Sequence, residues 1–208
     1  IATWVDTGID KPDDYSEDEI LSIFKNNELE NMDSVVAEEK DEDHPNIIFI
    51  QLESFIDPDM IKCVETSAPA APYFKSLTNE VSSGWFEVPS FGAGTANIEF
   101  ESMTGISARF FGPGEYPYKS VLRKETVESI PYDLKKLGYS THAIHNHRGV
   151  FYNRNEVFPN LGFDDFDSVE YMNDVEKTPK NWEKDNVLTG EIMEALNKTE
   201  GKDYIYTI

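Results

Sequence analysis

The sequence is poor in cysteine and in positive charge. Cys63 is the one cysteine among 208 residues, so no disulfide can form within the chain and no cysteine-based metal site is expected. Lysine and arginine number 18 against 40 aspartates and glutamates, which gives a net charge of −22. This balance argues against DNA or RNA as a partner and against electrostatic binding to anionic lipid headgroups, because both kinds of binding need a basic face. An anionic substrate would need a local metal ion or arginine to offset this field.

The sequence also lacks a long apolar stretch. No run of about 18 apolar residues is present and no signal peptide is recognisable, so no part of the chain is predicted to span a membrane. The chain starts at Ile1 rather than methionine. We therefore expect it to be a piece of a longer protein, with any membrane anchor outside these residues.

Residues 1–44 are predicted to form an acidic lead-in. Ser16 and Glu19 make a capping box ahead of apolar residues at helical spacing, so one short helix is expected there. The acidic stretch 28–43 is expected to be loose, since such a charge run is usually solvated.

From Asn46 onward, short apolar runs alternate with amphipathic segments. This alternation predicts an α/β fold with a mostly parallel central sheet and helices on both faces. The first run, residues 46–52, suits a central strand covered on both sides. The region 151–169 is expected to be rich in loops. The further predicted strands are 84–88, 140–144 and 203–208, and the predicted helices are 69–79, 95–103, 127–137 and 186–197.

Two candidate chemical groups follow predicted strands. Glu53 comes directly after the first strand, where ligands gather in parallel sheets, and a carboxylate there can hold a cation. The alternative is a solvent-exposed glutamate at a strand end. Thr95 follows Gly92 and Gly94 at the start of a helix, where free N–H groups favour an anion or alkoxide. The alternative is that Thr95 only caps the helix.

A third candidate group lies in residues 141–154. Alternation places His145 on the opposite face from Ile144 and just beyond the predicted strand. His145 and His147 form a His-x-His pair, which alone is a weak metal signal. The planar fork of Arg154 suits a phosphate, and the alternative is a polar loop with one structural arginine.

Taken together, these segments resemble the lipoteichoic acid synthase-type phosphoglycerol transferases of the alkaline phosphatase/sulfatase superfamily. The resemblance covers about residues 44–208, so that 45–208 are identified as the N-terminal part of a sulfatase-like catalytic domain. Three motifs carry it: NIIFIQLESFID at 46–57, SFGAGTANIEFESMTG at 90–105 and HNHRGVFYNR at 145–154.

The resemblance implies a role for six residues. It implies Thr95 as the catalytic nucleophile, Glu53 and Thr95 as ligands of Mn²⁺, and Mg²⁺ as a substitute. The residues that match the family's substrate loop are His145, Phe151, Tyr152 and Arg154, with Tyr152 standing where the family usually has tryptophan.

The implied reaction moves phosphoglycerol from phosphatidylglycerol to a cell-envelope glycan or polymer. Thr95 would carry the group as a covalent intermediate. The implied location is the extracellular face of a bacterial cell membrane, with the parent protein anchored by transmembrane helices outside this chain.

The C-terminal end departs from the family pattern. Residues 203–208 resemble the strand that leads to a substrate-binding histidine, and the family's Asp-His metal pair comes later still. We therefore expect the fold to be incomplete at the C-terminus, metal binding by this chain to be weak or absent, and the chain alone to be inactive. We also expect an uncovered sheet edge or face to promote self-association.

Two alternatives stay open. The first is a hydrolase on the same fold, either a phosphodiesterase or a sulfuric ester hydrolase. A formylglycine sulfatase is disfavoured because residues 63–67 and 95–99 lack the proline and arginine of its C/S-x-P-x-R segment. The second is a non-catalytic binding module that keeps the fold without the chemistry.

Overall fold

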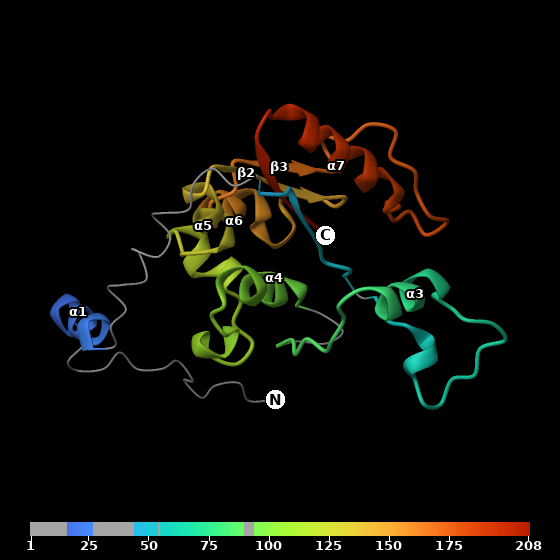
Figure 1. Ribbon diagram of the computed structural model, residues 1–208, viewed down its shortest axis with the longest axis horizontal. Helices are drawn as coiled ribbons and strands as arrows, with labels where there is room; N and C mark the ends of the chain where they lie inside the picture. The colour runs from blue at the N-terminus through green and yellow to red at the C-terminus, as the bar shows by residue number, and fades with distance from the viewer. Residues whose placement is uncertain (1–15, 27–43, 54, 90–93) are drawn as a thin grey trace.

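The computed structural model describes residues 16–26, 44–53, 55–89 and 94–208 (Figure 1). The α-helices are α1 (Glu17–Asn26), α3 (Pro72–Glu80), α4 (Thr95–Thr104), α5 (Ile130–Lys136), α6 (Arg154–Asn160) and α7 (Asn186–Lys198). The strands are β1 (Ile47–Ile50), β2 (Tyr139–His145), β3 (Asp165–Ser168) and β4 (Lys202–Thr207). Short 3₁₀ turns occur at Pro58–Met60, Ala108–Phe111, Pro117–Lys119, Val121–Arg123 and Phe151–Asn153.

The four strands form one parallel sheet in the order β1-β4-β2-β3. The longest pairing joins β2 to β4, from Tyr139 opposite Lys202 to Ile144 opposite Thr207. β1 pairs with β4 and β3 with β2, both in parallel. The predicted α/β fold with a parallel sheet is therefore confirmed, and all four carboxyl ends point to the same edge.

Helices cover both faces of the sheet. In Figure 1, α7 lies on one side of the strands and α4, α5 and α6 lie on the other. Alternate residues of β2 and β4 supply the two cores, as the two-residue period of a strand requires. The core under α7 contains Ile144, Met172, Leu188, Ala195 and Ile205, and the larger core opposite includes Ala96, Phe100, Met103, Ala143, Val157, Phe158, Tyr204 and Tyr206.

The first strand is at the edge of the sheet, and the prediction of a central strand covered on both sides is wrong for the described residues. Ile48 is 43% exposed and Ile50 is 56% exposed. The apolar composition of β1 predicts burial, but sheet position is set by long-range pairing, and β1 pairs with β4 alone.

Two other predictions needed correction. Residues 84–88 form no strand, and Trp85 is 90% exposed, because aromatic and β-branched composition produces a strand only where a partner strand is available. The region 151–169 contains α6 and β3 rather than mainly loops. β3 carries two aspartates, which are poor strand formers, and pairing with β2 outweighs that preference.

The remaining described elements follow the sequence closely. Ser16 accepts a hydrogen bond at its Oγ from the N–H of Glu19 (3.2 Å), as the capping box predicts. α4 ends at Gly105, which has the left-handed φ of 69° that a terminating glycine adopts. The predictions for residues 28–43 and for the turn at 91–93 lie outside the described residues. No helix in the described part of the chain is long and apolar enough to span a bilayer.

Candidate active site at the carboxyl ends of the strands

Thr95 and Glu53 are hydrogen-bonded although they are 42 residues apart in the sequence. Glu53 follows β1, and Thr95 is the first residue of α4. The Thr95 hydroxyl donates to Glu53 Oε1 over 2.6 Å. The N-cap of α4 is Gly94 rather than Thr95, and the Thr95 hydroxyl bonds to Glu53. The simple capping interpretation of Thr95 is therefore wrong, and its hydroxyl is directed at a carboxylate.

Gly94 allows this arrangement. Its φ of 84° lies in the left-handed region, where a residue with a Cβ is strained. The glycine is buried, and it is followed immediately by the free N–H groups of the ten-residue helix α4. These N–H groups and the helix dipole favour negative charge beside the Thr95 oxygen.

Tyr152 lies beside this pair. Its hydroxyl is hydrogen-bonded to the backbone of Gly94, and its ring stacks on Tyr116 with centroids 5.8 Å apart. Burial and the neighbouring Tyr116 raise the pKa of Tyr152, so the hydroxyl stays protonated. Tyr152 and Asn153 both have positive φ, at 55° and 57°. Such strain in consecutive non-glycine residues costs on the order of 1–3 kcal/mol each and is typical of functional loops.

His145 is the last residue of β2 and is buried. Its Nδ1 lies 3.0 Å from the carbonyl oxygen of Ile208, so this nitrogen carries the proton and donates it. Burial and then the positive charge of Arg154 lower the pKa of His145 to about 3. The ring is therefore neutral at physiological pH, with the lone pair on Nε2.

Arg154 is the first residue of α6 and is fully buried against Glu99 of α4. Its Nε donates to Glu99 Oε2 at 3.0 Å and its Nη2 to Glu99 Oε1 at 2.5 Å. Burial opposes the charge, but Glu99 keeps the pKa of Arg154 above its ordinary value. The Nη1 atom is buried without a hydrogen-bond partner among the described residues. Two of the three guanidinium nitrogens are thus bonded to Glu99, which favours the structural-arginine interpretation.

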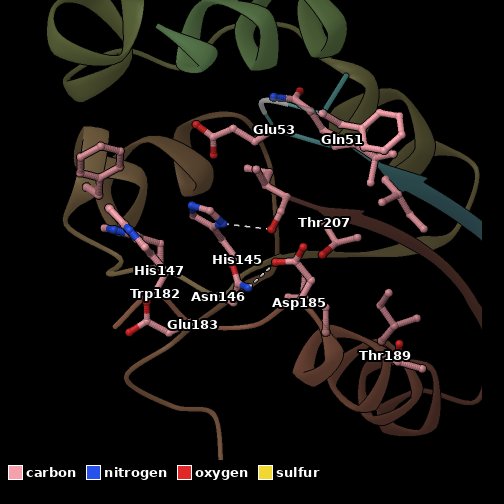
Figure 2. A pocket seen from close by; sticks show the side chains of 17 residues that line it. Gln51, Glu53, His145, Asn146, His147, Trp182, Glu183, Asp185, Thr189 and Thr207 are labelled. Carbon is pink, nitrogen blue, oxygen red and sulfur yellow. Dashed lines mark hydrogen bonds between the residues drawn. The ribbon is translucent and has the colours of Figure 1, made fainter. Parts of the chain in front are cut away.

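A pocket of about 800 Å³ opens at the carboxyl ends of β1, β2 and β4 (Figure 2). Three residues singled out from the sequence line it: Glu53, His145 and Phe151. Thr95, Tyr152 and Arg154 are not among its lining residues. The other polar and aromatic lining residues are Gln51, Phe55, Asn146, His147, Trp182, Glu183, Asp185, Thr189 and Thr207.

The sequence did not single out several of these lining residues. Asn146 lies inside the motif 145–154 but had no assigned role, and His147 was noted only as part of a weak His-x-His metal signal. Trp182 and Asp185 come from the segment before α7 and carry no recognisable spacing. Glu99 was also missed, although its place on the same helix as Thr95, one turn on, is a usable signal.

Metal binding by these residues is only partly supported. Glu53 and Thr95 place two oxygen donors together, and such donors suit Mn²⁺ or Mg²⁺. No group of three or more histidine, cysteine, aspartate or glutamate residues suited to a metal occurs in the described ranges. Two donors do not complete a coordination shell, so a metal ion here would need ligands beyond this pair.

Comparisons with known proteins converge on one family. The family model described as Sulfatase matches residues 45–208. A Rhizobium meliloti protein named for cyclic β-1,2-glucan modification is 32% identical over 164 residues, which is 79% of this chain and 25% of that protein.

Two solved structures share the fold. The lipoteichoic acid synthase LtaP of Listeria monocytogenes is 28% identical with a TM-score of 0.64, over 79% of this chain and 40% of its own. The phosphoglycerol transferase GacH of Streptococcus pyogenes, solved with sn-glycerol-1-phosphate, is 23% identical with a TM-score of 0.75, over 97% of this chain and 54% of its own. The chain thus spans between a quarter and about half of the length of these relatives.

Proposed function

Because the chain belongs to the sulfatase family, within the alkaline phosphatase superfamily, we propose that it transfers phosphoglycerol from phosphatidylglycerol to a cell-envelope glycan or polymer, with Thr95 as the nucleophile. The observation that carries the proposal is the 2.6 Å hydrogen bond from the Thr95 hydroxyl to Glu53. The names of the relatives add to it, since one is a lipoteichoic acid synthase and another is named for glucan modification.

In the first step, the Thr95 oxygen attacks the phosphorus of phosphatidylglycerol. A bond forms between Thr95 Oγ1 and phosphorus, and the bond from phosphorus to the diacylglycerol oxygen breaks. The proton of the Thr95 hydroxyl passes to the Glu53 carboxylate and from there to the departing diacylglycerol oxygen. The N-terminus of α4 stabilises the negative charge on the threonine oxygen.

In the second step, a hydroxyl of the acceptor attacks the same phosphorus. The bond to Thr95 breaks, and the threonine oxygen regains a proton from the acceptor hydroxyl. Each step replaces one phosphate ester bond by another, so no oxidant or further co-reactant is required. If water takes the place of the acceptor, the same intermediate gives hydrolysis.

The neighbouring side chains position the substrate in this proposal. His145 has a pKa of about 3, too low for a proton carrier at neutral pH, so its Nε2 accepts a hydrogen bond from a glycerol hydroxyl. The unpaired Nη1 of Arg154 and the ring faces of Phe151 and Tyr152 contact the phosphoglycerol group.

A divalent metal ion, Mn²⁺ or Mg²⁺, would be held by Glu53 and Thr95 together with further ligands. When bound, it lowers the pKa of the threonine hydroxyl and polarises the phosphoryl oxygen. Because the described residues offer only this pair of donors, we propose that the 208-residue chain alone binds metal weakly and turns over little or not at all.

The proposed setting is the outer face of a bacterial cell membrane. Residues 1–44 would form a lead-in, and residues 45–208 would form the N-terminal part of the catalytic domain, in a protein anchored by transmembrane helices outside this chain.

The test is peptide mass spectrometry on the full-length natural protein. The protein is incubated with Mn²⁺ and a soluble phosphatidylglycerol analogue, and the peptide containing Thr95 is then mapped. A glycerophosphate adduct on Thr95 supports the proposal, and the variants Thr95→Ala and Glu53→Gln are expected to lose it. Thr78→Ala, on the exposed helix α3, is the matched control and keeps it. Metal-loaded wild-type protein that stays unmodified on Thr95 refutes the proposed nucleophile.

A further inference from the structure

We infer that the outer part of the pocket is a subsite for an uncharged sugar ring of the acceptor, with Trp182 as its stacking surface. The inference rests on the proposed transferase function and specifies the acceptor class: a neutral glycan rather than a growing polyanionic polymer. It uses residues to which the family resemblance assigns no role.

An aromatic row runs through the pocket towards the nucleophile. The ring of Trp182 lies 6.1 Å from that of His147, and His147 lies 4.7 Å from Phe151. Phe151 in turn lies 4.6 Å from Tyr152, whose hydroxyl reaches the backbone of Gly94 beside Thr95. Figure 2 shows His147, Trp182 and Glu183 together on one side of the pocket. The row therefore leads from three pocket-lining rings to Tyr152, which lies beside Thr95.

Trp182 is unusually accessible for a tryptophan held in place by its backbone. Its exposed fraction is 59%. The backbone N–H of Trp182 donates to Thr178 Oγ1 at 3.1 Å, and the Trp182 carbonyl accepts from the backbone N–H of Thr178 at 2.7 Å. An antiparallel bridge between Lys177 and Glu183 closes the same turn, and Asn181 holds a left-handed φ of 64°.

This turn presents a large apolar ring to solvent and fixes the backbone that carries the ring before any ligand arrives. Such preorganisation reduces the entropy lost on binding. The apolar C–H face of a sugar ring matches an exposed indole face, and the hydroxyls at the ring edge remain free for polar groups.

The polar groups of the pocket select against negative charge. Glu53, Glu183 and Asp185 line it, whereas no lysine or arginine is among the lining residues within the described ranges. Lys177 pairs with Glu183 at 3.0 Å, which leaves the balance negative. His145 adds no positive charge because its ring is neutral.

A polyanionic acceptor would meet repulsion from these carboxylates. Carboxylates instead accept hydrogen bonds from hydroxyl groups. Asp185 is already held by Asn146 Nδ2 at 2.9 Å, which fixes its second oxygen for a ligand. A binding site for a neutral, hydroxyl-rich sugar ring needs both an aromatic face and oxygen atoms that accept hydrogen bonds, and this pocket offers both.

The test separates acceptor binding from donor chemistry in the full-length protein. The probes are neutral gluco-oligosaccharides and an oligo(glycerol phosphate). Adduct formation on Thr95 is measured without acceptor, and transfer is measured with each probe. Trp182→Ala is expected to keep the adduct and to raise the KM for the gluco-oligosaccharide on the order of tenfold. The KM of Trp182→Phe should lie between those of the wild type and Trp182→Ala. Trp85→Ala changes a tryptophan outside the pocket, and its KM should match that of the wild type.

Unchanged gluco-oligosaccharide transfer by both Trp182 variants overturns the inference. A preference of the wild-type protein for the oligo(glycerol phosphate) also overturns it. Saturation-transfer NMR of gluco-oligosaccharide binding gives an answer that does not depend on turnover. If wild-type protein forms no Thr95 adduct but binds the sugar through Trp182, the transferase proposal fails and the sugar subsite stands. If the adduct forms and the sugar does not bind, the subsite alone fails.

Discussion

Replacing either partner of the buried Glu99–Arg154 pair should strongly destabilise the fold. Both side chains have zero exposure, and two parallel hydrogen bonds join them. The pair connects α4, which begins with Thr95, to α6, which follows the 3₁₀ turn Phe151–Asn153. Loss of one partner leaves the other charge buried without compensation.

The expected magnitude follows from that geometry. Breaking a buried, hydrogen-bonded ion pair costs about 3–5 kcal/mol, most of it the penalty of the charge left behind. A domain of this size loses about 2–4 °C in Tm for each kcal/mol. Glu99→Leu or Arg154→Met alone should therefore lower the Tm by about 6–20 °C.

Chemical denaturation of the two single variants and the double variant tests this reasoning. The double variant Glu99→Leu/Arg154→Met removes both charges and is expected to be more stable than either single variant. A single variant with the same free energy of unfolding as the wild type would refute the claim that the remaining charge is buried without compensation. So would a double variant whose loss equals the sum of the two single losses.

The same double variant separates the two roles of Arg154. It should fold, yet it lacks the unpaired Nη1 that is proposed to contact phosphate. Formation of the Thr95 adduct should therefore fall well below wild type although the fold is intact. Wild-type adduct formation in this variant would leave Arg154 with a structural role alone.

Two further predictions concern pH and association. Burial opposes the charge of His142, but the hydrogen bonds that its ring donates to Asp165 and Asp203 outweigh burial and raise the pKa of His142 above the ordinary value of 6.5. The stabilisation by protonated His142 is therefore complete below pH 6.5 and is lost as the pH rises through the raised pKa. The difference in unfolding free energy between wild type and His142→Asn should then shrink with rising pH. A difference that stays constant with pH would contradict this. The exposed apolar edge strand β1 should promote self-association of the 208-residue chain, so Ile50→Lys should lower the mass measured by sedimentation, whereas a strictly monomeric wild type would count against that surface.

Local patterns in the sequence were sufficient for the strand and helix types that depend on neighbours along the chain. The capping box at Ser16, the terminating Gly105 and the apolar runs of β2 and β4 each act through residues a few positions away. The alternation of these elements determined the parallel α/β class. The order of three motifs was enough to recognise the resemblance to the family. The most specific motif combines a glycine at position 94, where the backbone turns closely, with an oxygen donor at Thr95.

The tertiary structure alone decided what depends on contacts between distant segments. The edge position of β1, the pairing that makes β3 a strand despite its aspartates and the absence of a strand at 84–88 follow from which partners are available in space. The structure also showed that Arg154 is buried against Glu99, and that Trp182 joins His147 in one pocket. These pairs are separated by tens of residues and carry no periodic signal. Their geometry arises because parallel strands bring their carboxyl ends to one edge, which sequence spacing does not encode.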